Sequence, residues 1–111
     1  MSTATLSHMD ALTRLGNALA DSTRTRILMS LRDAPACPSD LAEALGVSRQ
    51  VMSNQLACLR GCGLVEKVPA GRRSWYRLAD PKLGDVLGSM LELVLEVEPG
   101  CCAPGGCSCN A

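Results

Sequence analysis

Two cysteines, Cys58 and Cys62, lie four residues apart in a stretch whose other residues are typical of a helix. If residues 48–62 are helical, both side chains project from one helix face, about one turn apart. Two thiolates at that spacing can hold the same soft metal ion. Further thiols near the carboxyl end could supply the missing ligands: Cys101, Cys102, Cys107 and Cys109. The cysteines therefore predict a metal site in which thiolates of this helix are ligands.

The chain has seven cysteines, no apolar run long enough to span a membrane, and a start without a basic or apolar signal region. We therefore expect a cytoplasmic protein, whose thiols stay reduced. In that compartment the cysteines favour metal binding or redox sensing over a disulfide framework.

Length and composition predict a single small domain. The chain has 111 residues, 47% of them hydrophobic, and it lacks phenylalanine, so one core must be built from Leu, Val, Ala and Met. We expect a flexible N-terminus at 1–9, one folded domain at 10–98, and a cysteine-rich tail at 99–111.

Charge is distributed unevenly, although the formal net charge is zero. Residues 44–79 hold six basic side chains against one acidic side chain, a balance of +5, whereas 1–43 has −1 and 80–111 has −4. The middle third thus has the charge of a phosphate-binding face. A solvated basic surface is the alternative reading of the same pattern.

The spacing of apolar residues predicts four helices before residue 63. The first spans 10–20, and the second follows an N-cap at Asp21-Ser22. The third begins at Pro38 and ends at Gly46, and the fourth is capped by Ser48. The buried positions are Leu12, Leu15, Leu19, Ile27, Leu28, Leu31, Leu41, Ala42 and Leu45. Two helices joined by a short turn with glycine predict a helix-turn-helix, whose second helix enters the DNA major groove.

The fourth helix has one apolar and one polar face. Met52, Leu56 and Leu59 recur at helical spacing and should face the core. The polar side near its start can contact bases or phosphates, or can be merely solvated. Its candidate DNA-binding residues are Ser48, Arg49, Gln50, Ser53 and Asn54.

Beyond this helix, residues 64–68 and 74–78 predict two short strands around a turn. Tyr76 and Leu78 should pack inward, with Trp75 outside. We expect Arg72 and Arg73 at the tip, where this wing can grip flanking phosphates. A last helix should run from Pro81 to about residue 97, with an apolar stripe of Leu83, Val86, Leu87, Met90, Leu91 and Val94. Together with the first helix, this stripe predicts a homodimer interface.

The chain resembles the ArsR/SmtB family of winged-helix metal-sensing repressors over residues 10–97. The likeness is carried by residues 18–28, 40–48, 59–65 and 71–80. It implies a mainly α fold with a small β-hairpin, a winged helix-turn-helix of order α-α-α-α-β-β-α, which binds double-stranded operator DNA as a dimer. Cys58 and Cys62 with the intervening residues look like the site of the CmtR group of cadmium/lead sensors. That resemblance implies a third ligand from the tail, Cys101 or Cys102, between which the spacing does not choose.

Some family features are absent from the sequence. Gln55 stands where the recognition helix of the family commonly has histidine, and Ser39 stands where some members pair a second cysteine with Cys37. Cys37 is thus expected to be a buried core residue. His8 is the only histidine, which excludes a zinc site of histidines and carboxylates on the last helix.

Thiolates without imidazole favour soft effectors, with cadmium or lead preferred. Arsenite or antimonite is the alternative, since tail cysteines alone could form a trithiolate, and zinc, copper(I) and mercury remain open. Cys58 and Cys62 could also be buried core residues. A redox-sensing repressor and a metal buffer without DNA function are the other candidate functions. The sequence contains no acid/base pair, nucleotide loop or cysteine–histidine dyad, so an enzyme is not expected.

Overall fold

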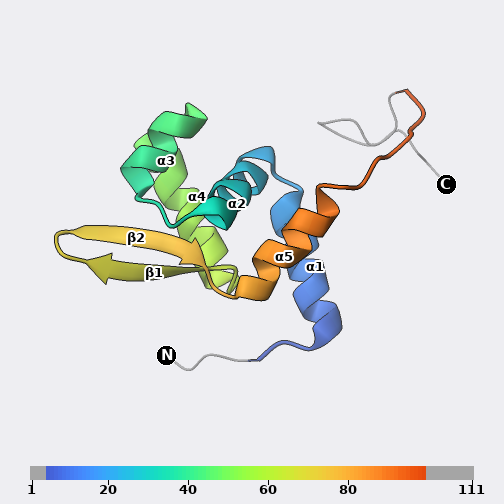
Figure 1. Cartoon of the computed structure of the whole chain (residues 1–111), viewed down its shortest axis with the longest axis horizontal. Coiled ribbons are helices and arrows are strands. Elements are labelled where there is room, and N and C mark those ends of the chain that lie inside the picture. Colours follow the sequence, from blue (N-terminus) through green and yellow to red (C-terminus); the bar gives the residue numbers. More distant parts are fainter. Residues whose placement is uncertain (1–4, 100–111) are drawn as a thin grey trace.

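The computed structural model describes residues 5–99, which form five helices and one two-stranded antiparallel hairpin (Figure 1). In chain order the elements are α1 (His8–Leu19), α2 (Ser22–Asp33), α3 (Pro38–Leu45), α4 (Arg49–Gly61), β1 (Val65–Ala70), β2 (Arg73–Leu78) and α5 (Pro81–Met90). This is the predicted winged helix-turn-helix, with the hairpin projecting away from the helices as the wing. Within residues 5–99, no helix is long and apolar enough to cross a membrane.

Short polar side chains cap four of the helices, and Asp80 does so for α5 by accepting from the Lys82 N–H. The carboxylate of Asp21 accepts a hydrogen bond from the Arg24 backbone N–H, at 3.0 Å, and so caps α2. The hydroxyl of Ser48 accepts from the Val51 N–H, at 3.1 Å, and caps α4. Ser7 caps α1, which therefore begins at His8, two residues before the predicted start.

A single core lies between α2, α3, α4, β1 and α5. The inward residues predicted on α2 and α4 are all buried: Ile27, Leu28, Leu31, Met52, Leu56 and Leu59. Leu87 of α5 and Val65 of β1 complete the core. α1 contributes Ala18 to the core, whereas its predicted inward residues are only half-buried at Leu15 and Leu19 and exposed at Leu12.

The hairpin is longer than predicted, with Val65 paired to Leu78 at its base and Ala70 paired to Arg73 near its tip. Its turn is therefore Gly71-Arg72, where Gly71 has a φ of +65°. The predicted turn at 69–73 was too wide, because the ladder continues through Pro69 and Ala70. Tyr76 packs against the core as expected, and it exchanges backbone hydrogen bonds with Ala36 at 2.8 and 3.0 Å. Those bonds fix the hairpin to the loop before α3.

The last helix is shorter than predicted. α5 ends at Met90, not near residue 97, so Leu91 and Val94 lie beyond it. The following apolar side chains are exposed, with Val94 at 86%. A terminal helix in water needs packing on its apolar face to persist, and residues 5–99 leave these side chains exposed. The prediction from the spacing of the apolar stripe therefore overestimated the length of this helix.

An arginine of α2, Arg32, connects α5 to the rest of the domain, because its side chain lies against two glycines of α5. The guanidinium Nε of Arg32, on α2, donates to the Gly84 carbonyl oxygen at 2.9 Å. A Cβ built on Gly88 would collide with the same guanidinium. Gly88 thus leaves room for this guanidinium beside α5.

Candidate DNA interface and thiolate metal site

The exposed face of α4 presents polar side chains that can reach bases. Arg49, Gln50, Ser53 and Asn54 are all exposed, as the sequence predicted. Gln50 Nε2 donates to Asn54 Oδ1 at 3.0 Å, so the two amides lie side by side one helical turn apart. Amide and guanidinium groups are the ones that form paired hydrogen bonds with base edges. Ser48, also predicted as a DNA contact, caps the helix with its hydroxyl.

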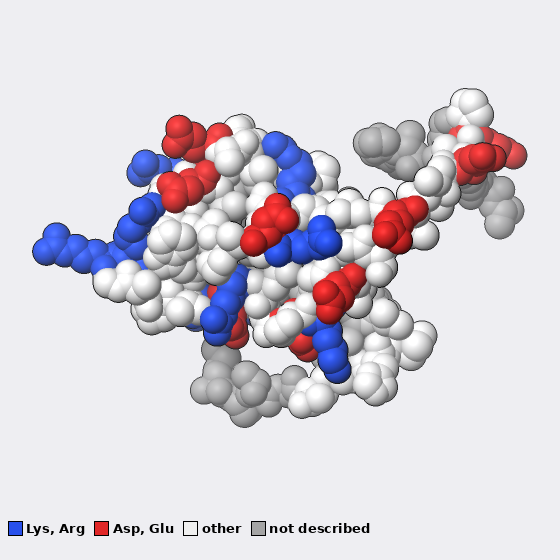
Figure 2. Space-filling view, in the orientation of Figure 1, with Lys and Arg blue, Asp and Glu red and all other residues white. Residues whose placement is uncertain are grey.

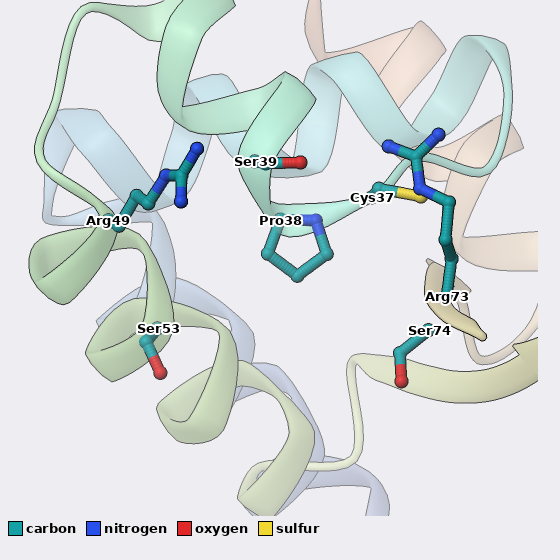
Figure 3. A pocket seen from close by; sticks show the side chains of 7 residues that line it. All are labelled: Cys37, Pro38, Ser39, Arg49, Ser53, Arg73 and Ser74. Carbon is teal, nitrogen blue, oxygen red and sulfur yellow. The ribbon is translucent and has the colours of Figure 1, made fainter.

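A groove of about 410 Å³ lies between the start of α3, the start of α4 and the hairpin (Figure 3). Its walls are Cys37, Pro38, Ser39, Arg49, Ser53, Arg73 and Ser74. Figure 3 shows Arg49 and Arg73 on opposite sides of it. Guanidinium and hydroxyl donors around one hollow complement a phosphate group. Ser39 and Ser74 were missed by sequence reasoning, because only the packing of three elements brings them together.

The two arginines predicted at the wing tip occupy different environments. Arg72 is exposed in the turn. Arg73 is instead the first residue of β2, where its Nη2 lies 3.3 Å from Asp40 Oδ2 and its guanidinium lies 5.7 Å from the Trp75 ring centroid. Both arginines thus lie in or directly beside the turn, as predicted, and Arg73 is the one that pairs with an acidic side chain among the described residues.

Basic side chains project from the free end of the hairpin in Figure 2. Part of the positive charge of the middle segment is neutralised, since Arg73 pairs with Asp40 and Arg77 pairs with Glu66. All four side chains are about half exposed, so both ion pairs can exchange readily with water or with another anion.

Cys58 and Cys62 lie at the end of α4, one helical turn apart. The Cys62 N–H donates to the Cys58 carbonyl oxygen at 3.0 Å, which is the α-helical hydrogen bond that the predicted spacing requires. Cys62 is the C-cap, followed by Gly63 with a φ of +79°. Two further bonds, from Gly63 N–H to the Arg60 oxygen and from Leu64 N–H to the Leu59 oxygen, complete a Schellman motif.

The two thiols are accessible, unlike the third described cysteine. Cys58 is exposed and Cys62 is half-buried, so the reading of Cys58 as a core residue was wrong. Cys37 is 2% exposed, which confirms its expected place in the core. Within residues 5–99, no three Cys, His, Asp or Glu side chains cluster closely enough to hold a metal ion. A thiolate site on α4 thus needs another ligand, and the candidates Cys101 and Cys102 lie outside the described residues.

Comparison with known proteins identifies relatives of the same fold and family. Residues 21–67 match the family model "Bacterial regulatory protein, arsR family". The HTH-type transcriptional regulator CmtR of Mycobacterium tuberculosis is 51% identical over 88 residues, which cover 79% of this chain and 75% of that protein. The NMR structure of this cadmium metal-sensor superposes with a TM-score of 0.65 at 50% identity, covering 78% of this chain and 90% of the other.

Two other solved structures share the fold. The homodimeric winged helix-turn-helix domain of Mb0332 from Mycobacterium bovis, described as a possible ArsR-family regulator, has a TM-score of 0.70 at 29% identity, covering 80% of this chain and 87% of that one. The antimony-specific transcriptional repressor AntR has a TM-score of 0.66 at 32% identity, covering 81% and 83%. The family model, the extent of identity to CmtR and the winged helix-turn-helix fold agree. This chain belongs to the ArsR family of bacterial transcriptional regulators.

Proposed function

We propose that this protein is a transcriptional repressor that binds operator DNA as an apo homodimer and leaves it when a soft metal ion binds to cysteine thiolates. The observation that carries the proposal is the accessible Cys58–Cys62 pair on the last turn of the candidate recognition helix. The same helix presents its exposed polar face to DNA about two turns earlier. A metal bound at one end of α4 can therefore alter how the other end meets DNA.

The donor set supports a soft divalent effector, with cadmium or lead favoured. The chain has a single histidine, His8 of α1, and it is not among the residues that line the cavity beside Cys62. Three thiolates suit cadmium and lead better than harder ions. The 50% identical CmtR structure is that of a cadmium metal-sensor, which supports the same class here. We propose Cys101 or Cys102 as the third ligand, from the tail at 99–111 that follows the folded domain at 10–98.

DNA contact is proposed for the exposed face of α4 and for the wing. Arg49, Gln50, Ser53 and Asn54 would meet bases or neighbouring phosphates, Ser48 would position the helix, and Arg72 with Arg73 would hold the flanking backbone. The homodimeric state of the Mb0332 domain supports two-fold binding, with two recognition helices in successive major grooves.

Arsenite or antimonite is the second candidate effector. AntR, an antimony-specific repressor, is 32% identical in structure-based comparison, so a trivalent ion is compatible with this fold. In that case tail cysteines alone would form the sensor, and Cys58 would be dispensable. A thiol redox switch is the third possibility, and it would respond to oxidants without added metal.

One titration tests these alternatives. Fluorescently labelled operator with bound protein is titrated with cadmium, lead or arsenite, while DNA release and thiolate–metal absorbance are recorded together. We expect release by cadmium or lead, with the absorbance rising in step and all thiols recovered after chelation. Release by arsenite alone would support the trivalent effector. Release with loss of free thiols in the absence of metal would support the redox switch.

A further inference from the structure

Arg73, at the rim of the groove between α3, α4 and the hairpin, already has an anionic partner in the free protein. Its Nη2 donates to Oδ2 of Asp40 at 3.3 Å, and Asp40 lies in the first turn of α3. The guanidinium also lies 5.7 Å from the ring centroid of Trp75. The side chains of Arg73 and Asp40 are 54% and 60% exposed, so another anion can reach the pair from solution.

The groove itself is lined by positive and hydroxyl groups. Its polar side chains are Arg49, Arg73, Ser39, Ser53 and Ser74. Asp40 is not among the lining residues, although it follows Ser39 directly in the sequence. Figure 3 shows the two arginines on opposite sides of the hollow. A phosphate of the DNA backbone fits these donors, whereas the carboxylate that holds Arg73 carries the same sign of charge as the phosphate.

A phosphate that enters the groove must share Arg73 with Asp40 or take its place. The guanidinium carries one positive charge, so a carboxylate and a phosphate beside it leave one net negative charge. Because an ion pair between exposed side chains is weak, Arg73 can leave Asp40 at small cost. The carboxylate then lies near the phosphate without a partner. Asp40 therefore opposes phosphate binding in the groove without preventing it.

We propose that Asp40 lowers the affinity of this protein for the DNA backbone, because it competes with a phosphate for Arg73. The inference rests on the proposed DNA-binding function, and it adds a residue that acts through an arginine of the wing. Backbone contacts carry no sequence information, so Asp40 weakens binding to every sequence by a similar factor. The base preference of α4 is left unchanged.

A neutral variant of Asp40 tests the proposal on the full-length, reduced and metal-free protein. The probe is a fluorescently labelled duplex of random sequence, and affinity is measured by anisotropy over a range of salt. Asp40→Asn removes the charge but keeps the size and an oxygen that can accept from Arg73. We expect it to raise the affinity at low salt at least twofold, on the order of fivefold.

The salt dependence gives a second readout of the same exchange. In wild type, Asp40 loses its partner when Arg73 binds a phosphate, and it then attracts a cation from solution. That uptake offsets part of the cation release from DNA. Asp40→Asn removes the offset, so its affinity should fall more steeply with salt. Asp40 also favours the first turn of α3 by its charge. Affinities are therefore compared well below the thermal unfolding transition of each variant, and Asp40→Ser serves as a second neutral variant.

Glu66→Gln is the matched control. Glu66 lies on β1 and pairs with Arg77, which does not line the groove. The control therefore changes the net charge by the same amount and also frees an arginine of the wing. We expect its affinity to rise less than twofold. Arg73→Gln should weaken DNA binding, and in that background Asp40→Asn should raise the affinity no more than Glu66→Gln does in wild type.

The results that overturn the inference differ from the one that overturns the proposed function. No rise in affinity for the neutral Asp40 variants, or an equal rise for Glu66→Gln, would make the competition proposal wrong while DNA binding stands. A rise that is just as large in the Arg73→Gln background would also overturn it, because Asp40 would then act without Arg73. If wild type does not bind duplex DNA even at low salt, the proposed DNA-binding function fails and this inference fails with it.

Discussion

At the residue scale, the placement of Cys62 depends on its glycine neighbour. Gly63 adopts a left-handed conformation, with a φ of +79°, and this lets the chain turn out of α4 directly after Cys62. A residue with a Cβ is strained in that conformation by about 1 kcal/mol. The thiol thereby stays one helical turn from Cys58 while the chain reverses toward β1. The local backbone, rather than tertiary packing, sets the spacing of the pair.

Serine substitution should separate DNA binding from metal response. Cys58→Ser and Cys62→Ser remove one accessible thiol each, and neither thiol need touch DNA, so operator affinity should stay within about threefold of wild type. Metal-induced release should be lost, because two thiolates no longer meet on α4. DNA anisotropy with and without cadmium measures both effects. A Cys58→Ser protein that leaves the operator at the wild-type cadmium concentration would contradict the α4 site.

Cys37→Ser is the matched control, since Cys37 is 2% exposed and should only affect stability. Its metal response should therefore equal that of wild type. Among the tail residues, one of Cys101→Ser and Cys102→Ser should abolish the response and the other should leave it nearly intact. Equal behaviour of the two would argue against a single third ligand.

At the scale of elements, three of them converge on the groove at the start of α4. Arg49 and Ser53 come from α4, Ser39 from α3, and Arg73 from β2. The hairpin is held in place by the backbone hydrogen bonds between Tyr76 and Ala36. The shape of the groove therefore depends on the position of the wing. A phosphate bound there would contact both the wing and the recognition helix.

The wing and the recognition helix should contribute different terms to DNA binding. Arg72→Ala removes an exposed charge at the hairpin tip, so it should weaken binding to any sequence and lower the salt slope by about one. Gln50→Ala should instead relax base preference, with an expected loss of about 1–3 kcal/mol on the operator only. Binding isotherms on operator and random DNA, over a range of salt, measure both. Unchanged operator affinity in both variants would remove this face from the DNA interface.

At the scale of the whole molecule, α1 and α5 have apolar surface that remains exposed in the part of the chain that the structure describes. Leu12 is 63% exposed on α1, and Val86 and Met90 are 46% and 38% exposed on α5. The apolar residues after α5 are exposed too, and a second copy could cover them and lengthen the helix. This uncovered face is where a dimer partner fits best.

A charge placed on that face should therefore dissociate the proposed dimer. Val86→Glu would bury a carboxylate in an apolar interface, at a cost of about 2 kcal/mol or more per protomer. Sedimentation equilibrium should show a monomer, and operator binding should weaken as two-fold contact is lost. Val51→Glu is a matched control for sedimentation alone, because Val51 is 41% exposed on α4, whose start is the proposed DNA contact. If Val86→Glu sediments as wild type does, the dimer interface lies elsewhere.

Much of the fold and the thiol spacing could be predicted from the sequence because the interactions that specify them are local. The inward residues of α4 follow the helical period, Asp21 and Ser48 cap helices through residues three positions away, and Cys58 and Cys62 occupy successive turns. Each of these features depends on residues that are close in the sequence, so it can be recognised from the sequence alone.

Only the tertiary structure decided the features that join distant residues. Arg73, directly after the turn of the wing, pairs with Asp40, which is 33 positions away in the sequence. Arg14, Cys62 and Asp80 line one cavity although they come from distant parts of the sequence. α5 ends at Met90, and among the described residues nothing packs on the apolar side chains that follow it. Helical periodicity records which face of a segment is apolar, but the fold determines what, if anything, covers that face.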